Sequence, residues 1–405
     1  MEPWFADRIG AGLWLDGKNR PYGLMTLAVD DEAAASTGLA ELQRKKGAKK
    51  FGFVLRKDYA LVTVGNEAAQ DAVEAAAAEA DRETLAAAGQ FRRGLEWLPA
   101  RQTALAWIDL GKLGAMVKAM MDTALDGLEE DLDAEMPFGR VGLSGGLFPG
   151  MGGLTQDDDL KGQLILGARA ANNGVEIRFR GFDIPAPAPA GTTDARSAVD
   201  ALPADSAIAG SLRVGDIGEA LANEMLGTTA PLPEEMFEGM PPAEAEEVRK
   251  QLQESRDKMQ AIAEAFAAVS GAKLTLSVTK HDDLGFLVAG ETTSAENATT
   301  LARSLEMLGE DGDVTVTASG NKVELKSKGY AAGGGSLGGE ALYRQALEGA
   351  PEQANVVFYV DVQRLLADAG LTSEERAQVK PVKAIGLAAG LDGQDQVGLL
   401  RIVIE

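Results

Sequence analysis

The alternation of apolar runs and turn residues at the start of the chain predicts two hairpins with a helix between them. Apolar runs at residues 9–16 and 22–29 flank a polar turn, and a second pair covers residues 51–55 and 59–64. Between the pairs, acidic residues 30–32 precede Leu39 and Leu42, and Gly47 follows, as at the start and end of a helix. Helices near residues 66–80 and 84–98, a strand at 103–110 and a Met-rich helix from Lys112 complete the pattern.

The same order of elements recurs in the second half. A hairpin at 272–290, a helix at 294–308 and a hairpin at 314–318 and 322–326 match the first hairpins and helix, and a Gly-rich loop at 333–339 replaces the Ala-rich helix. VGLSGGL at 141–147 also matches IGLAAGL at 385–391. Two sets of five residues share the same spacing: Phe91, Leu95, Pro99, Asp109 and Leu113, and Tyr343, Leu347, Pro351, Asp361 and Leu365. We interpret this as one ancestral unit used twice.

The predicted fold is therefore α+β and internally duplicated. Antiparallel sheets are built from hairpins, helices pack on one face, and two halves are pseudo-equivalent. We expect a first repeat unit at 1–184 and a second at 272–405. Residues 185–271 hold the stiff linker PAPAPAG, a partial repeat strand at 207–214 and a long amphipathic helix. Whether the halves form separate domains or one continuous sheet stays open. Residues 4 and 5 occupy the place of Phe266 and Val269 before the second hairpin, so we expect the chain to begin inside a repeat.

Charge and cysteine content narrow the functions. The 405 residues carry 62 acidic against 39 basic side chains, a net charge of −23, which opposes binding to nucleic acids and anionic membrane surfaces. The absence of cysteine excludes disulfides, thiolate metal sites and cysteine nucleophiles. No stretch of this chain reaches the roughly 20 apolar residues that span a bilayer.

Several segments resemble a known family. They are PWFADRIGAGLWLDGKNRPYGLMTLAV at 3–29, FRRGLEWLPARQTALAWIDLGKL at 91–113, LPADSAIAGSLRVGDIGEAL at 202–221 and LYRQALEGAPEQANVVFYVDVQRL at 342–365. Together they resemble the mainly actinobacterial family called domain of unknown function 3352. The resemblance covers most of the chain but carries element patterns, not catalytic residues. It implies an extracytoplasmic cell-envelope protein held by an N-terminal membrane anchor that this chain lacks.

The motifs that suggest chemistry have simpler interpretations. Ser144 lies in a G-x-S-x-G pattern, but residues 147–153 are too rich in Gly and Pro for the helix that a nucleophile elbow requires, and the second copy has Ala388 there. His281, the single histidine, lies in a predicted turn beside acidic residues. Acidic runs at 129–135, 157–159 and 310–313 fit solvated turns, with a weak Ca²⁺ site as the alternative. No cofactor is predicted.

An apolar surface is the remaining candidate site. Met116, Met120 and Met121 share one side of the predicted Met-rich helix, while Phe148 and Met151 form the apolar tip of a Gly-rich loop. Packing against the sheet is the commoner role of such residues, but methionines also adapt to irregular apolar partners. We expect a non-catalytic extracytoplasmic binding or scaffold module, with an unknown protein or apolar ligand at the cell envelope as its partner. A lipid carrier is the alternative, and a serine hydrolase using Ser144 is a distant third.

Overall fold

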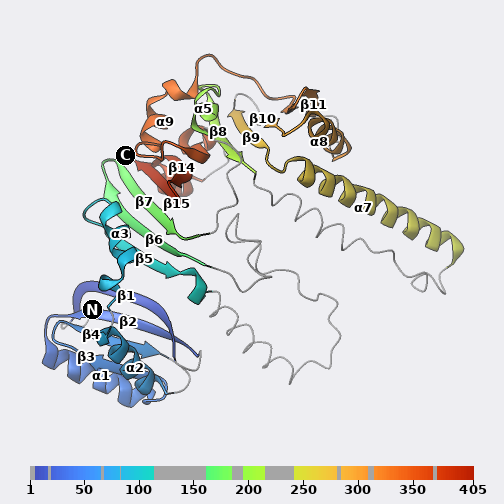
Figure 1. Ribbon diagram of the computed structural model, residues 1–405. Coiled ribbons are helices and arrows are strands. Elements are labelled where there is room, and N and C mark those ends of the chain that lie inside the picture. Colours follow the sequence, from blue (N-terminus) through green and yellow to red (C-terminus); the bar gives the residue numbers. More distant parts are fainter. Residues whose placement is uncertain are drawn as a thin grey trace. The chain divides into compact units, whose positions relative to one another are not determined.

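The computed structural model describes residues 5–16, 20–64, 68–82, 84–113, 161–184, 195–214, 241–280, 284–308, 314–367 and 372–405. The chain divides into two compact units, one made of Met1–Trp97 with Trp107–Gln163 and one of Leu98–Ala106 with Leu164–Glu405 (Figure 1). The described strands form a four-stranded and an eleven-stranded sheet. Helices and mostly antiparallel sheets are mixed along the chain, in agreement with the predicted α+β content.

The four-stranded sheet has the order β1-β2-β4-β3. Its strands are β1 (Phe5–Leu15), β2 (Pro21–Val29), β3 (Phe51–Leu55) and β4 (Tyr59–Val64). Helix α1 (Glu32–Lys46) is capped by Asp31, whose carboxylate accepts from the Ala34 N–H, and packs Leu39 onto one face. Helix α2 (Ala69–Arg82) begins against the other face, where a Cβ on Gly52 would lie 2.5 Å from the Ala69 carbonyl oxygen.

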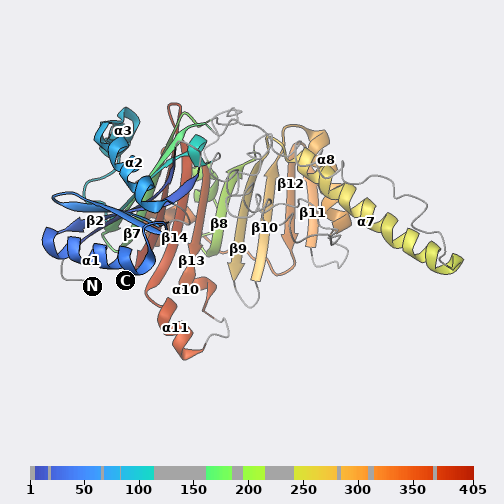
Figure 2. The ribbon, with the colours of Figure 1, turned by 90° about the horizontal axis from the view of Figure 1, so that it is seen from below.

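After α2 the chain forms a short 3₁₀ helix and an α-helix. The strands that follow in the sequence form the eleven-stranded sheet (Figure 2). Its order is β11-β12-β10-β9-β8-β13-β14-β15-β7-β6-β5. The elements from residue 85 onward are η1 (Leu85–Ala87), α3 (Gly89–Trp97), β5 (Ala104–Asp109), β6 (Gln163–Ala171), β7 (Gly174–Phe182), α5 (Ala195–Asp200), β8 (Ser206–Arg213), α7 (Pro242–Ala268), β9 (Lys273–Lys280), β10 (Leu284–Glu291), α8 (Ala295–Leu308), β11 (Val314–Ser319), β12 (Lys322–Ser327), η3 (Leu337–Gly339), α9 (Ala341–Ala346), β13 (Ala354–Asp361), α10 (Val362–Leu365), α11 (Ser373–Val379), β14 (Val382–Asp392) and β15 (Asp395–Ile404).

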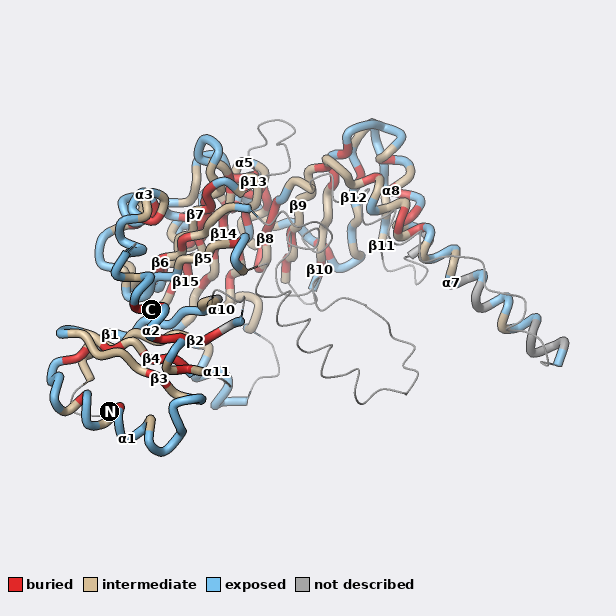
Figure 3. The backbone as a smooth tube through the Cα atoms, turned by 60° about the horizontal axis from the view of Figure 1, so that its bottom comes forward, coloured by how far each residue is buried: buried red, intermediate tan, exposed pale blue. Residues whose placement is uncertain are grey.

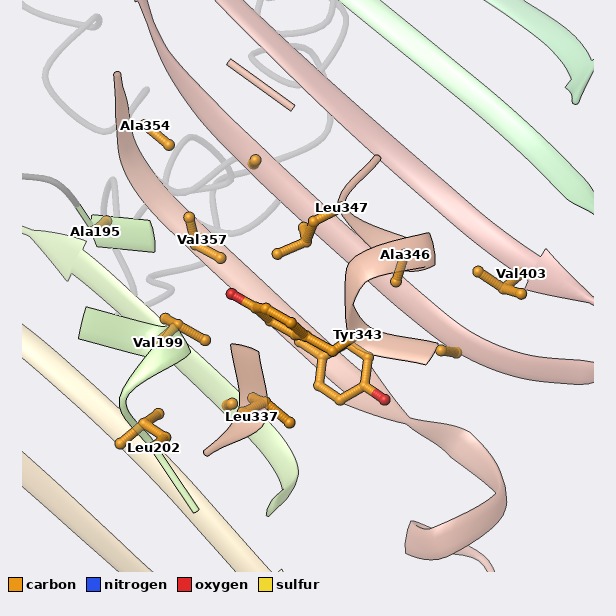
Figure 4. Close-up of a cluster of buried hydrophobic side chains, with 14 residues drawn as sticks. Ala195, Val199, Leu202, Leu337, Tyr343, Ala346, Leu347, Ala354, Val357 and Val403 are labelled. Carbon is orange, nitrogen blue, oxygen red and sulfur yellow. The ribbon is translucent and has the colours of Figure 1, made fainter. Parts of the chain in front are cut away.

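Helices pack on both faces of the eleven-stranded sheet, over different strands. Helices α5 and α9 cover β8 and β13–β15, where Val199, Tyr343 and Tyr359 are almost fully buried (Figure 4). Helix α8 packs against the opposite face of β10 and β12, around Val323. The expectation that helices cover one face is therefore corrected. The reason is that the strands carry apolar residues on both sides, so each face can receive a helix.

Strands β1–β4 and β9–β12 are arranged alike. The order β9-β10-β12-β11 matches β1-β2-β4-β3, and the pairing register is also the same. Leu27 pairs with Ala60, and Gly290 pairs with Val323; both residue numbers differ by 263 between the two pairs. Pairs of β3 with β4 map onto pairs of β11 with β12 by the same offset.

The residues with matching spacing also make matching contacts. The rings of Phe91 and Trp107 meet edge to face with centroids 5.5 Å apart, and those of Tyr343 and Tyr359 do so at 5.3 Å. The Asp109 carboxylate accepts from the Lys112 N–H, and the Asp361 carboxylate accepts from the Arg364 N–H. All these numbers differ by 252, as from 109 to 361.

Strands β5–β7 and β13–β15 form two three-stranded groups that meet where β7 pairs with β15. Strand β7 begins at Gly174 and β15 at Asp395, an offset of 221, which makes Arg178 the counterpart of Leu399. Arg178 and Leu399 are also directly paired, so residues at the same place in β7 and β15 lie opposite each other. By sheet position β6 corresponds to β14. Residues 141–147, which the sequence pattern matches with 385–391, lie outside the described ranges.

Candidate binding surface

The residues proposed from the sequence as a site are outside the part of the chain that the structure describes. These are Met116, Met120, Met121, Phe148 and Met151. Ser144, His281 and the acidic runs at 129–135, 157–159 and 310–313 fall outside it too. The described residues form a different apolar surface, which lies on the eleven-stranded sheet.

This surface consists of three rows of residues that cross five strands, and we call it the apolar face. Directly paired residues of neighbouring strands point to the same side of a sheet, so the register defines each row. In the order β8, β13, β14, β15, β7, the rows are Ile208, Val360, Ile385, Ile402 and Val175; Gly210, Phe358, Leu387, Leu400 and Ile177; and Leu212, Val356, Ala389, Gly398 and Phe179. All fifteen positions are aliphatic, aromatic or glycine.

Exposure distinguishes the apolar face from the opposite side of the same strands. Leu212 is 43% exposed, and Phe358 and Val175 are each 37% exposed. Apart from its two glycines, every residue of the apolar face is at least partly exposed. On the side covered by α5 and α9, Tyr359 and Leu399 are at most 2% exposed. Buried and part-exposed residues accordingly alternate along β13, β14 and β15 (Figure 3).

Two glycines of the apolar face lie beneath aromatic rings of neighbouring strands. A Cβ on Gly210 would lie 2.7 Å from the ring of Phe358, its partner on β13. A Cβ on Gly398 would likewise run into the ring of Phe179, its partner on β7. Each ring therefore lies over the backbone of the neighbouring strand, as aromatic residues do when they cover a cross-strand glycine.

The opposite side of β7 and β15 holds a buried ion cluster around Glu176. The Glu176 carboxylate, 1% exposed, accepts hydrogen bonds from the guanidinium groups of Arg169 at 3.0 Å, Arg178 at 2.8 Å and Arg401 at 2.7 Å. Arg401 also donates to Glu348 at 2.6 Å. Burial by itself raises the pKa of Glu176, but the three arginine hydrogen bonds outweigh it and lower the pKa to about 2.

This cluster fixes structure and offers no acid or base. Glu176 stays ionised at neutral pH, and both of its oxygens are bonded to arginines. Arg180, farther along β7, donates in the same way to Asp392 and Asp395 at 2.9 and 2.7 Å. The charges therefore hold β6, β7 and β15 together across the junction of the two strand groups.

The described ranges also contain a polar hollow on the eleven-stranded sheet. A shallow polar hollow lies at β11 and β12, lined by residues that include Thr315, Glu324, Lys326 and Tyr330. Within these ranges no three acidic or histidine side chains are grouped to hold a metal ion. No described helix combines the length and the apolar character needed to cross a membrane.

Comparison of the chain with protein-family models, with curated proteins and with solved structures finds no match. The apolar face was not predicted as a site from the sequence. Its signal is nevertheless present, because β13 (ANVVFYVD) and β14 (VKAIGLAAGLD) are apolar at both odd and even positions. Such strands normally have both faces buried, and only the sheet shows that one face is not.

Proposed function

We propose that this protein is a non-catalytic binding or scaffold module and that the apolar face holds its partner. The observation that carries the proposal is an apolar face of fifteen positions across β7, β8, β13, β14 and β15, all of them at least partly exposed except the two glycines. A continuous apolar surface of this kind marks an interaction site in soluble proteins. Each Å² that a partner removes from water contributes about 25 cal/mol.

The ion cluster supports a binding role over a catalytic one. Glu176 is the carboxylate most shielded from water in the described chain, and three arginines keep it ionised and occupied. A general acid or base needs a pKa near the working pH and access to a substrate. Glu176 has neither property, and its charge partners serve to join strands.

An internal duplication is part of the proposal. It is supported by the common strand order, the constant register offset of 263 and the paired ring contacts of Phe91 with Trp107 and Tyr343 with Tyr359. The pairing of β7 with β15 at matching positions agrees with two copies of one three-stranded group. The setting at the cell envelope, outside the cytoplasm and behind a membrane anchor, follows from the family resemblance.

A carrier of lipid or another apolar ligand is the second candidate. The apolar face favours it because none of its fifteen positions has a polar or charged side chain. A protein partner normally adds a polar rim with hydrogen bonds, whereas an acyl chain needs only apolar contact. The two candidates therefore differ in what occupies the same surface.

Phe358→Glu tests both candidates at once. The substitution places a charge in the central row, and Leu85→Glu is the matched control, since Leu85 is 49% exposed on η1. Protein purified from cells would be studied by native mass spectrometry for bound lipid and by crosslinking for bound protein. We expect the wild type and Leu85→Glu to retain a partner, and Phe358→Glu to lose it by at least about tenfold. Equal retention by Phe358→Glu would overturn the assignment of the surface.

A further inference from the structure

Strand β1 presents a long bare edge on the four-stranded sheet. It is the outermost strand, and β2 is its one partner among the described residues. All residues from Arg8 to Leu13 are exposed, with Ile9 at 64% and Leu13 at 63%. Natural proteins protect edges with charges, prolines or short strands, but β1 has 11 residues and is uncharged from Ile9 onward.

The corresponding edge elsewhere in the chain is occupied. In the strand order β9-β10-β12-β11, β9 takes the position that β1 has in the order β1-β2-β4-β3. The edge of β9 that corresponds to the bare edge of β1 is paired, antiparallel, with β8. Ile9 pairs with Leu27, and Leu274 pairs with Gly290, the counterpart of Leu27. By this register Ile9, Ala11 and Leu13 correspond to Leu274, Leu276 and Val278.

The residues of β8 indicate what kind of strand could pair with the edge of β1. The partners of Leu274, Leu276 and Val278 on β8 are Leu212, Gly210 and Ile208. On the other side of β8 lie small residues, Ala207, Ala209 and Ser211, all buried. Along β8, aliphatic or glycine residues therefore alternate with small residues. A strand of this kind would form backbone hydrogen bonds with the unpaired edge of β1.

We propose that β1 binds, in antiparallel orientation, an extended segment of a partner protein with the alternating aliphatic and small residues of β8. The expected register places an aliphatic residue opposite Leu13, a small residue opposite Ala11 and an aliphatic residue opposite Ile9. This inference rests on the proposed binding function, for which it names the class of partner. The edge is separate from the apolar face, so each can be tested alone.

Disulfide trapping tests the register, because the chain has no cysteine of its own. Ala11→Cys in the full chain would be incubated in a glutathione buffer with the labelled peptide SAIACSLR, which is the β8 sequence with cysteine at the Gly210 position. Gly12→Cys with the peptide SAICGSLR, which has its cysteine at the Ala209 position, tests the next pair along the strand. Both pairs are tested because hydrogen-bonded and non-hydrogen-bonded pairs alternate in an antiparallel ladder, and the side chains are closer in the non-hydrogen-bonded pair. Ala86→Cys, exposed on η1, is the control site.

We expect at least one matched pair to be trapped about tenfold more than the same peptide at Ala86→Cys, and more than a peptide with its cysteine at the Ser206 position. Ile9→Lys combined with Leu13→Lys should remove that preference. Equal trapping at all sites, or disulfide-linked pairs of the chain through Ala11→Cys, would overturn the inference. Because Phe358 does not belong to this edge, loss of partner binding in Phe358→Glu and failure of trapping at β1 are separate results.

Discussion

At the scale of single residues, Glu176 shows how a buried charge is tolerated in this protein. Its three guanidinium partners come from β6, β7 and β15, and the hydrogen bond to Arg401 links residues 225 apart in sequence. Such a group stabilises the fold while all partners are present, and the loss of one member leaves unpaired charges in a dry site. The spacing of Arg169, Glu176 and Arg178 gave no indication of this, because Arg401 is supplied by the last strand.

Glu176→Gln should therefore lower the free energy of unfolding by on the order of 3 kcal/mol at pH 7, measured by urea denaturation. Glu348→Gln is the matched control: it also removes a carboxylate bound to Arg401, but the Glu348 side chain is 73% exposed, and we expect a loss below about 1 kcal/mol. The pKa of Glu176 is lowered from 4.5 to about 2, so its contribution is present above pH 4.5 and disappears as the pH falls toward 2. Equal stability of Glu176→Gln and wild type at pH 7 would contradict the role of the cluster.

At the scale of elements, glycines set how closely helices approach the sheet. Helix α9 lies on β14 where Gly386 faces the Ala346 carbonyl oxygen, so there is no space for a Cβ. The neighbouring Tyr343 and Leu347 are then fully buried against β13 and β14. The spacing of Tyr343, Leu347 and Pro351 predicted a helix followed by a strand here, but it did not indicate which strand would contact the helix.

Gly386→Ala should destabilise the protein by about 1–3 kcal/mol, because the obstructing atom belongs to the backbone and the whole helix must shift. Gly89→Ala, at the first residue of α3 with no atom within 4 Å of the added Cβ, is the control and should be neutral or slightly stabilising. Both changes would be measured by thermal unfolding. A Gly386→Ala protein as stable as the Gly89→Ala protein would show that α9 is less closely held than the structure indicates.

At the scale of the whole molecule, residues from both predicted repeat units share one sheet. Strands β5–β7 belong to the predicted unit at 1–184 and β13–β15 to the predicted unit at 272–405, yet β7 pairs with β15 along eight residue pairs, from Gln396 with Gly181 to Val403 with Gly174. The predicted boundaries describe the repeat pattern. The eleven-stranded sheet continues across them, while β1–β4 of the first predicted unit form a sheet of their own.

A fragment of residues 195–405 should consequently self-associate. It keeps β8–β15 but exposes the edge of β15 that β7 covers. A second copy can pair antiparallel at this edge with its Leu399 in the place of Arg178, opposite Leu399 of the first copy. Sedimentation velocity at equal molar concentrations would compare the fragment with the full chain. We expect the fragment to sediment as a dimer or larger species, and a stable monomer would refute this use of the edge.

The sequence by itself determined several of the hairpins, strands and helices and their order along the chain. Local spacing was sufficient for the hairpins at 272–290 and 314–326 and for the strand at 207–214, because turn residues and apolar periodicity act within a few residues. The candidate site was not predictable in the same way. The proposed methionines lie outside the described residues, and the apolar face arises from strands that the pattern marked only as apolar on both sides.

The tertiary structure alone decided which apolar side chains are buried and which remain on the surface. Phe358 and Tyr359 are neighbours on β13, but the ring of Tyr359 is enclosed by α9 and α5, whereas Phe358 lies over Gly210 and is 37% exposed. The pairing of β7 with β15 and the meeting of Glu176 with Arg401 have the same origin. Each depends on contacts between residues far apart in the chain, whose energies are gained only when the sheet closes, so no local pattern encodes them.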